Sequence, residues 1–318
     1  MKAIYKTTEE TGIFEKIDTY CDGNWVCLIA PTAEEVQEVS QHFEIDLQDM
    51  VSALDEDERA RVDSDDDYTM IIIDVPYKDE EDSRENRESY GTVPLAIILG
   101  DTDKRYIITV CLRELQLLDD FRGGKIKKFF TYKKTRFILQ ILYRNATYYL
   151  HYLRMLERSI GGIEDALHKS TRNEELFKLL ALDKSLVYLS NSLRANGLVL
   201  DRLMRLDAVK KYPEDEELLE DVIVENQQAI EMANVYSSIL DVTMEAYSSV
   251  ISNNLNSVMK VLTSATLIMT IPTMIFSFFG MNVPLPWEHS AGGFWYICLV
   301  SLIATAIVVF FMFRRKMF

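Results

Sequence analysis

The sequence predicts an α+β membrane protein in which a mixed N-terminal domain is followed by long helices and then by two transmembrane helices. Three observations lead to this fold class. Short β-branched runs alternate with helical patterns up to about residue 132. The 58 residues between Pro213 and Pro272 contain no Gly and no Pro, which predicts one very long helix. Two apolar segments without charge, 261–279 and 294–313, then follow close to the C-terminus.

The 318 residues carry a formal net charge of −16, which is unevenly distributed. From Asn256 onward there are four basic residues and one acid, so the first 255 residues hold 30 basic and 49 acidic residues, a net charge of −19. An acidic body repels phosphates, which argues against nucleic acid as a partner and is compatible with binding of cations. The four cysteines form no CxxC pair, as is typical of free thiols in a reducing cytosol.

The first 132 residues are expected to form a small α/β domain. Strands are predicted at 24–31, 68–77, 93–101 and 106–111, where short runs are rich in β-branched residues. Helices are predicted at 32–43 and 112–121. Thr32 and Glu35 have the spacing of a capping box, in which each side chain accepts a hydrogen bond from the other residue's backbone N–H.

Long helices are expected from about residue 133. Two amphipathic patterns predict helices at 133–170 and 173–206. The stretch KYPEDEELLEDVI, at 211–223, then opens the segment without Gly or Pro. If that segment is one helix, it is about 87 Å long at 1.5 Å per residue. This length exceeds that of a globular helix, so we expect the helix to run from the soluble part into the membrane.

The two apolar segments are each long enough to cross a hydrocarbon core of about 30 Å. Lys260 precedes the first, and Arg314, Arg315 and Lys316 follow the second. The positive-inside bias therefore places both ends of the chain on the cytoplasmic side of the membrane, which is expected to be a plasma or inner membrane. The predicted division is a cytoplasmic α/β domain at 1–132, cytoplasmic antiparallel helices at 133–212, a stalk helix at 213–260, transmembrane helices at 261–279 and 294–313, an external loop at 280–293 and a basic cytoplasmic tail at 314–318.

A polar stripe follows one face of the long helix into the first span. Its members recur at steps of three and four residues: Glu245, Ser249, Ser252, Asn256, Met259, Thr263, Thr266, Thr270, Thr273 and Ser277. Nine of these ten residues are polar, and a 3.5-residue repeat of this length predicts a face turned toward a partner or a shared axis. Two helices cannot enclose a wet channel, so the stripe predicts an oligomer with the first spans around a central pore.

A simpler interpretation of the stripe needs no pore. Ser and Thr in membrane helices often bond the carbonyl four residues earlier, and small polar residues also mark ordinary helix packing. The regularity of the run and its continuation to Asn256 and Glu245 favour a pore. A lining of hydroxyls and amides suits a cation that keeps its water, as Mg²⁺ does. A site for a bare ion would need several carboxylates, and only Glu288 is available between Asn256 and Phe318.

The motif Gly280-Met281-Asn282, at the outer end of the first span, resembles the signature of the CorA family of divalent-cation transporters. The two-span C-terminus, the basic tail and the long proline-free helix strengthen this resemblance, and so do the segments 54–62, 66–76 and 256–263. It covers essentially the whole chain. The resemblance implies a homopentamer in the lipid bilayer, in which the long helices form a funnel and five first spans surround one pore.

The resemblance also implies site residues. Gly280, Met281 and Asn282 would form the outer mouth and selectivity site, where the Asn282 carbonyl meets a hydrated Mg²⁺. The stripe and the resemblance together assign the pore lining to Asn256, Met259, Leu262, Thr263, Thr266, Thr270, Thr273 and Ser277. The family binds regulatory Mg²⁺ between subunits, which implies Asp221 and Glu245, with a partner acid among Asp65, Asp66 and Asp67. Mg²⁺ is thus expected as both the transported and the regulatory ion, without an organic cofactor.

The expected function is channel-like, non-enzymatic Mg²⁺ uptake driven by the membrane potential and gated by cytoplasmic Mg²⁺, with Co²⁺ and Ni²⁺ as further ions. No GxxxxGK[ST] motif exists in the chain, so no ATPase motor is predicted. Thr270 stands where the family can have an apolar Met ring, which leaves the gate position and the ion preference open. A zinc transporter of the same superfamily is one alternative. A membrane-tethered cation sensor is another, although a tether needs neither the hydroxyl register nor Asn282.

Overall fold

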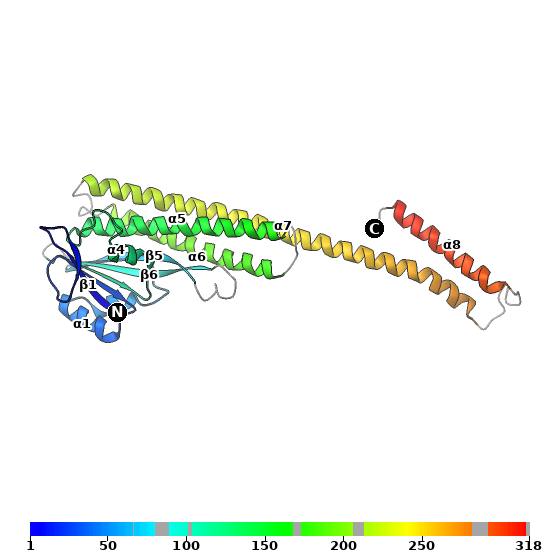
Figure 1. The fold of residues 1–318 in the computed structure, drawn as a ribbon, viewed down its shortest axis with the longest axis horizontal. Coiled ribbons are helices and arrows are strands. Elements are labelled where there is room, and N and C mark those ends of the chain that lie inside the picture. Colours follow the sequence, from blue (N-terminus) through cyan, green and yellow to red (C-terminus); the bar gives the residue numbers. More distant parts are fainter. Residues whose placement is uncertain are drawn as a thin grey trace. The chain divides into compact units, whose positions relative to one another are not determined.

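A computed structural model describes residues 1–65, 67–79, 89–100, 104–167, 173–205, 213–281 and 292–315. The chain forms two compact units, Met1–Thr243 and Met244–Phe318. The first unit contains a sheet and layers of helices on it, and the second contains the remainder of the longest helix and one further helix (Figure 1).

The first unit is built on a sheet of seven described strands in the order β2-β1-β3-β7-β6-β5-β4. The strands are β1 (Lys2–Thr7), β2 (Phe14–Ile17), β3 (Asn24–Ile29), β4 (Arg61–Ser64), β5 (Tyr68–Lys78), β6 (Tyr90–Gly100) and β7 (Tyr106–Cys111). Strands β3 and β7 are parallel, and the other described pairs are antiparallel. The four strands predicted from the sequence are confirmed as β3, β5, β6 and β7. Strand β1 and the edge strands β2 and β4 were missed, and the two edge strands have only four residues each and little apolar character.

The helices of the structure are α1 (Ala33–Phe43), α2 (Leu47–Ser52), α4 (Gln116–Arg122), α5 (Lys134–Leu167), α6 (Asn173–Leu203), α7 (Pro213–Phe279) and α8 (Gly293–Arg314). The predicted capping box is confirmed at α1, where the Thr32 and Glu35 side chains each accept from the other residue's backbone N–H. The helix predicted at 112–121 is wrong at its start. Helix α4 begins at Gln116 because Leu115 is extended and buried in the core.

Two hydrophobic cores lie on opposite faces of the sheet. On one face, Trp25, Phe121 and Phe137 pack among the apolar residues of α4 and α5. On the other face, Val39 and Met50 of α1 and α2 cover the sheet. Figure 1 shows this layering, with α1 on one side of the strands and the long helices on the other. Burial on both faces explains why β3 and β7 are mostly apolar and do not alternate with exposed polar residues, since even Asn24 and Thr109 are buried.

The first half of α7 packs on α5 and α6 through a buried stripe. Its residues recur at steps of three and four: Leu219, Val222, Asn226, Ala229, Ala233, Tyr236 and Leu240. The Tyr236 hydroxyl donates to Glu157 Oε2 at 2.9 Å, and the Thr243 hydroxyl donates to Glu164 Oε1 at 2.6 Å. Both carboxylates belong to α5, so this helix and α7 are joined by hydrogen bonds as well as by apolar packing. The single continuous helix predicted after residue 213 is confirmed through Phe279.

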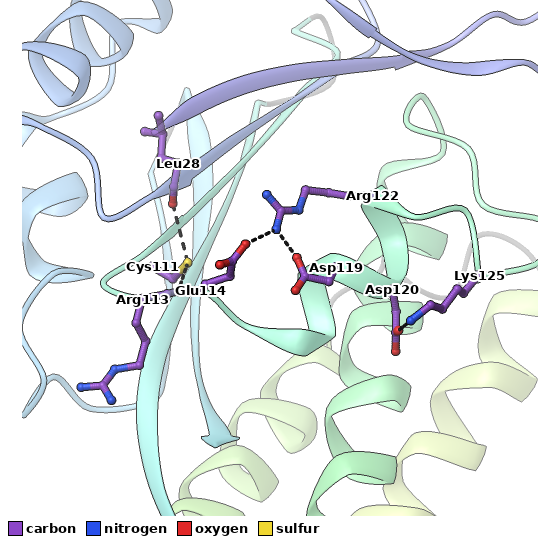
Figure 2. Close-up of polar contacts among 8 residues, drawn as sticks. All are labelled: Leu28, Cys111, Arg113, Glu114, Asp119, Asp120, Arg122 and Lys125. Atoms are coloured by element: carbon purple, nitrogen blue, oxygen red, sulfur yellow. Dashed lines mark hydrogen bonds and ion pairs between the residues drawn. The ribbon is translucent and has the colours of Figure 1, made fainter. Parts of the chain in front are cut away.

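A buried carboxylate fastens α4 to α5. The Asp120 side chain is 2% exposed and accepts from Lys125 Nζ at 2.9 Å, a contact drawn in Figure 2. It also accepts from both Arg144 Nε and Nη2 and from the Tyr148 hydroxyl. Burial opposes its ionisation, but these hydrogen bonds from Tyr148, Lys125 and Arg144 outweigh burial and hold the pKa of Asp120 below its usual value.

The segment RGGKIKK, at 122–128, carries no nucleotide-binding motif and supplies the cations of three ion pairs in this region. Figure 2 shows Arg122 between two carboxylates, Asp119 on α4 and Glu114 on the turn before α4. Nearby, the Cys111 thiol donates to the carbonyls of Leu28 and Arg113, and burial raises the pKa of this thiol. The basic residues Arg122 and Lys125 therefore have structural partners in the folded unit.

Candidate functional site

The second unit is dominated by apolar surface that is not covered within one chain. Both α7 and α8 contain segments long and apolar enough to cross a membrane, on length and composition. Large side chains such as Met269, Met274 and Trp295 are each 74% exposed. An apolar surface of this extent is unusual for a soluble protein and fits contact with lipid or with other copies of the chain.

One face of α7 in this unit is more buried than the rest. Ser264 is 2% exposed, and partly buried positions continue from it toward the helix end: Ile268, Ile271, Pro272, Ile275 and Phe279. The other described helix of the unit, α8, has a similarly buried serine, Ser301. Small residues allow close helix approach in membranes. This face is therefore the one that packs within the helical hairpin.

The hydroxyl residues of the polar stripe lie on another face of α7. Thr263, Thr266, Thr270, Thr273 and Ser277 are all exposed in the single chain. At 3.6 residues per turn, the middle of this face lies about 160° around the helix from the face that contains Ser264. The hydroxyls consequently do not serve the packing of α7 on α8. The remaining stripe residues, from Glu245 to Met259, are exposed as well.

The threonines of the stripe bond their own helix. The hydroxyls of Thr266, Thr270 and Thr273 donate to the carbonyls of Leu262, Thr266 and Met269 at 2.7–2.9 Å. The simpler interpretation of these residues as back-bonded thus describes their local geometry. This back-bonding does not exhaust the hydrogen-bonding capacity of the hydroxyls, because a hydroxyl that donates its proton keeps lone pairs that can accept from water. The outward side of the stripe is therefore a row of hydrogen-bond acceptors.

A groove runs along α7 at the start of the apolar segment. It has a volume of about 370 Å³ and is lined by Asn253, Asn256, Met259, Lys260, Thr263, Ser264 and Leu267. The structure therefore brings together three residues that the sequence assigned to the pore: Asn256, Met259 and Thr263. Asn253 was not predicted because it lies one position off the stripe. Its spacing of three residues from Asn256 is the signal that could have identified it.

The outer motif is described only in part. Helix α7 ends at Phe279, and the N–H of Gly280 donates to the carbonyl of Phe276 at 2.9 Å. A Cβ on Gly280 would lie 3.2 Å from that same carbonyl oxygen, a close approach that favours glycine. Met281 is 53% exposed. Asn282 lies outside the described residues, as do Asp66 and Lys316.

The acids assigned to regulation are exposed. Asp221 and Glu245 lie on α7, and Asp65 and Asp67 lie just before the start of β5. Asp67 lies 3.6 Å from Lys104 Nζ. Among the described residues, no group of three or more His, Cys, Asp or Glu side chains is arranged to hold a metal ion. A single chain thus does not assemble these acids into a metal site from its described part.

The chain thus combines a sheet-containing unit with a long helix, α7, whose C-terminal part and the following helix α8 are long and apolar enough to cross a membrane. The chain matches the family described as CorA-like Mg²⁺ transporter protein over residues 22–315, and it belongs to this family. This match confirms the resemblance seen in the Gly-Met-Asn motif and the C-terminal spans.

Individual relatives agree with this assignment. The chain is 29% identical over 302 residues to the cobalt/magnesium transport protein CorA of Methanocaldococcus jannaschii, covering 92% of this chain and 90% of that protein. The complete structure of the CorA magnesium transporter from that organism matches with a TM-score of 0.83 and 25% identity, over 99% of this chain and 98% of that one. The structure of its soluble domain matches with a TM-score of 0.65 and 26% identity, over 77% of this chain and 95% of that one.

Proposed function

We propose that the protein is a channel-like Mg²⁺ transporter that mediates uptake of the hydrated ion, with Co²⁺ and Ni²⁺ as secondary ions. The observation that carries this proposal is the exposed acceptor row of Thr263, Thr266, Thr270 and Thr273, which faces away from the hairpin contact. Mg²⁺ loses its water reluctantly, so acceptors that bind first-shell water suit it better than a cage of carboxylates. The relative from Methanocaldococcus jannaschii is a cobalt/magnesium transport protein, which supports Mg²⁺ and Co²⁺ as the ions.

The proposed pore requires several copies of the chain. In one chain, α7 exposes both its hydroxyl row and its apolar sides. Only the apolar sides are suited to contact with the hydrocarbon of a bilayer. A ring of five chains, with α7 of each on a common axis, places the hydroxyls around water and the apolar residues against neighbours and lipid. In this assembly the stalk helices form a funnel, both chain termini are cytoplasmic, and Asn282 forms the outer mouth.

The membrane potential suffices to drive uptake in this mechanism. Transfer of one charge across 100 mV releases about 2.3 kcal/mol, so a divalent cation gains roughly 4.6 kcal/mol on entering a negative interior. Cytoplasmic Mg²⁺ closes the pore by bridging Asp221 or Glu245 to an acid of a neighbouring chain, with Asp65, Asp66 and Asp67 as the candidates. Two unbridged carboxylates at about 4 Å repel by on the order of 4 kcal/mol at a surface-like dielectric, less in salt.

Flux into proteoliposomes tests this proposal. Purified protein should transport Mg²⁺ inward under a negative-inside potential, and added Co²⁺ should compete with it. Uptake of Zn²⁺ that exceeds uptake of Mg²⁺ in the same vesicles would contradict the proposed ion and favour a zinc transporter. Absence of flux for all three ions, from protein shown to be assembled, would contradict transport and favour the membrane-tethered sensor.

A further inference from the structure

The backbone of one strand residue, Asp74 of β5, is hydrogen-bonded to side chains of both α5 and α6. We call this contact, formed with Asn145, Tyr149 and Asn196, the joint. Asp74 stands opposite Pro94 of β6, a position that tolerates proline because the N–H and C=O of Asp74 both point away from β6. Strand β4 lies on that side of β5 but does not reach Asp74, because the pairing of β4 with β5 ends at Arg61 and Ile72. The N–H and C=O of Asp74 therefore need partners from outside the sheet.

The helices supply these partners through side chains. The N–H of Asp74 donates to Asn196 Oδ1 at 2.9 Å, and the Asp74 carbonyl accepts from Asn196 Nδ2 at 2.8 Å. The Asn196 amide thus pairs with β5 as a neighbouring strand would. The same carbonyl accepts from Asn145 Nδ2 at 2.9 Å and from the Tyr149 hydroxyl at 3.1 Å. One strand residue is consequently bonded to both α5 and α6.

The carboxyl of Asp74 has no compensating charge in this joint. It is partly buried, and no Lys or Arg of the described residues forms an ion pair with it. Helices α5 and α6 and strand β6 present only uncharged groups to the joint: Asn145, Tyr149, Ser192, Asn196 and Thr92. Of these, only Tyr149 can titrate, and burial raises its pKa well above the ordinary value. Burial likewise raises the pKa of Asp74 to about 6, against a hydrogen bond from Ser192 that lowers it.

One buried acceptor of the joint lacks a donor. Asn145 Oδ1 is buried and has no hydrogen-bond partner in the described structure. An ionised Asp74 side chain adds acceptors, whereas a protonated one contributes an O–H donor. Proton binding therefore removes an uncompensated charge and at the same time supplies the kind of group that the joint lacks.

We propose that Asp74 is a proton-binding switch of the soluble unit: its protonation tightens the joint of β5 with α5 and α6, and its ionisation loosens that joint. The consequence extends to α7. Asn226 Nδ2 of α7 donates to the Leu193 carbonyl of α6 at 3.3 Å, and a Cβ on Gly197 would lie 3.4 Å from that same nitrogen. Helix α6 thus contacts α7 at Gly197, next to Asn196. Acidification near pH 6 fixes the position of α6 against the helix that enters the proposed pore.

The sign of the pH dependence follows from the raised pKa. A carboxyl has an ordinary pKa of about 3.9 in an unfolded chain, so the folded unit binds the proton more tightly. The stabilisation from Asp74 is therefore fully present below about pH 4 and is lost as the pH rises through about 6. Above that pH the joint contains an ionised carboxylate.

The test compares thermal unfolding of the full-length protein in detergent at several pH values between 5 and 8. Asp74→Asn mimics the protonated form, so it should raise the Tm by about 5 °C at pH 8 and by about half as much at pH 5, which lies midway between the unfolded and folded pKa values. Asp201→Asn, an exposed carboxylate of the same α6, is the matched control and should show no such difference. The proton-binding claim does not depend on transport, and failure of the flux experiment would leave it standing.

A second variant and a local readout complete the test. Ser192→Ala removes the hydroxyl that stabilises the carboxylate, so it should move the pH midpoint of the wild-type transition upward. Hydrogen exchange of the amides around residues 145–149 and 193–197, corrected for intrinsic rates, should be faster in wild type than in Asp74→Asn at pH 8. A Tm difference between Asp74→Asn and wild type that is equal at pH 5 and pH 8, or a Ser192→Ala midpoint that does not move, would overturn the proposal.

Discussion

The two halves of α7 carry stripes with the same spacing and opposite surroundings. In the first unit, Leu219, Val222, Ala229, Ala233 and Leu240 recur at steps that keep them on one buried face. In the second unit, residues at steps of three and four from Thr263 to Ser277 are polar and exposed. A 3.5-residue repeat shows that a helix has one distinct face, but it does not show what that face contacts.

The difference between the halves lies in which partner each stripe requires. The apolar stripe of the first half is covered by α5 and α6 of the same chain, and bonds such as Tyr236 to Glu157 fix the contact. The polar stripe of the second half has no cover in one chain, and exposed residues such as Met269 and Met274 flank it. In the proposed assembly, water meets the polar side of this helix, and lipid or protein meets the other side.

The largest effect on Mg²⁺ uptake is expected from a substitution just beyond the C-terminal end of α7. A ring of Asn282 carbonyls would bind the first-shell water of the ion without removing it. Asn282→Ala should therefore reduce Mg²⁺ uptake to the level of empty vesicles while assembly is unchanged. His289→Ala, in the same loop, is the control and should retain uptake. Wild-type uptake by an assembled Asn282→Ala protein would remove this residue from the site.

The next effect concerns stability of the first unit. Asp120→Ala leaves Arg144 and Lys125 without their acceptor, and both can partly reach solvent. We expect a loss of about 2–3 kcal/mol in the free energy of unfolding, below the value for a fully buried pair. Lys125→Ala removes an exposed donor and should cost less than about 1 kcal/mol. Chemical denaturation measures both, and equal losses would show that burial of Asp120 does not determine its contribution.

The stabilisation from Asp120 depends on pH with the opposite sign to the stabilisation from Asp74. Because the pKa of Asp120 is lowered in the folded unit, its stabilisation is present above an unfolded value of about 3.9 and is lost as the pH falls below it. The loss caused by Asp120→Ala should accordingly shrink below about pH 4. A loss that stays constant from pH 7 to pH 3 would contradict the assigned direction.

Much of the fold was predictable because its signals are local. Apolar β-branched runs identified the central strands, and the Thr32 capping box identified the start of α1. The edge strands β2 and β4 were missed because pairing with a neighbour forms them, and their own residues carry little preference. The start of α4 was misplaced because burial of Leu115 in an extended conformation outweighs the helical pattern around it.

The site was predictable to the extent that it depends on periodicity. The steps from Thr263 to Ser277 identified an exposed row that the structure places away from Ser264. The Asp74 joint could not be found in this way, since Asn145 and Asn196 lie on different helices far from Asp74 in sequence. Whether Asp221 and Glu245 form a site depends on a neighbouring chain, which the sequence of one chain does not contain.

A smaller effect is expected on the closure of the transporter by cytoplasmic Mg²⁺, for which we propose one acid in each half of α7. Neutralising Asp221→Asn and Glu245→Gln together removes the acids proposed to bind cytoplasmic Mg²⁺. The Mg²⁺ concentration that closes the transporter should rise by about tenfold, which corresponds to about 1.4 kcal/mol of differential binding. Glu217→Gln, on an exposed face of the same helix, is the control. Closure of the double variant at the wild-type concentration would show that these acids only face solvent.

The most direct test of the pore is chemical access to the polar stripe. Single cysteines at Thr270, Thr273, Ile268 and Ile275 are introduced after Cys298 has been replaced by serine, and a water-soluble thiol reagent is added from outside at low internal Mg²⁺. Our account predicts fast labelling at Thr270 and Thr273, slow labelling at the partly buried positions Ile268 and Ile275, and block of Mg²⁺ uptake by the first pair alone. Equal labelling of all four positions, or labelling at Thr270 and Thr273 that leaves uptake intact, would mean that the hydroxyl face of α7 does not line the path of the ion.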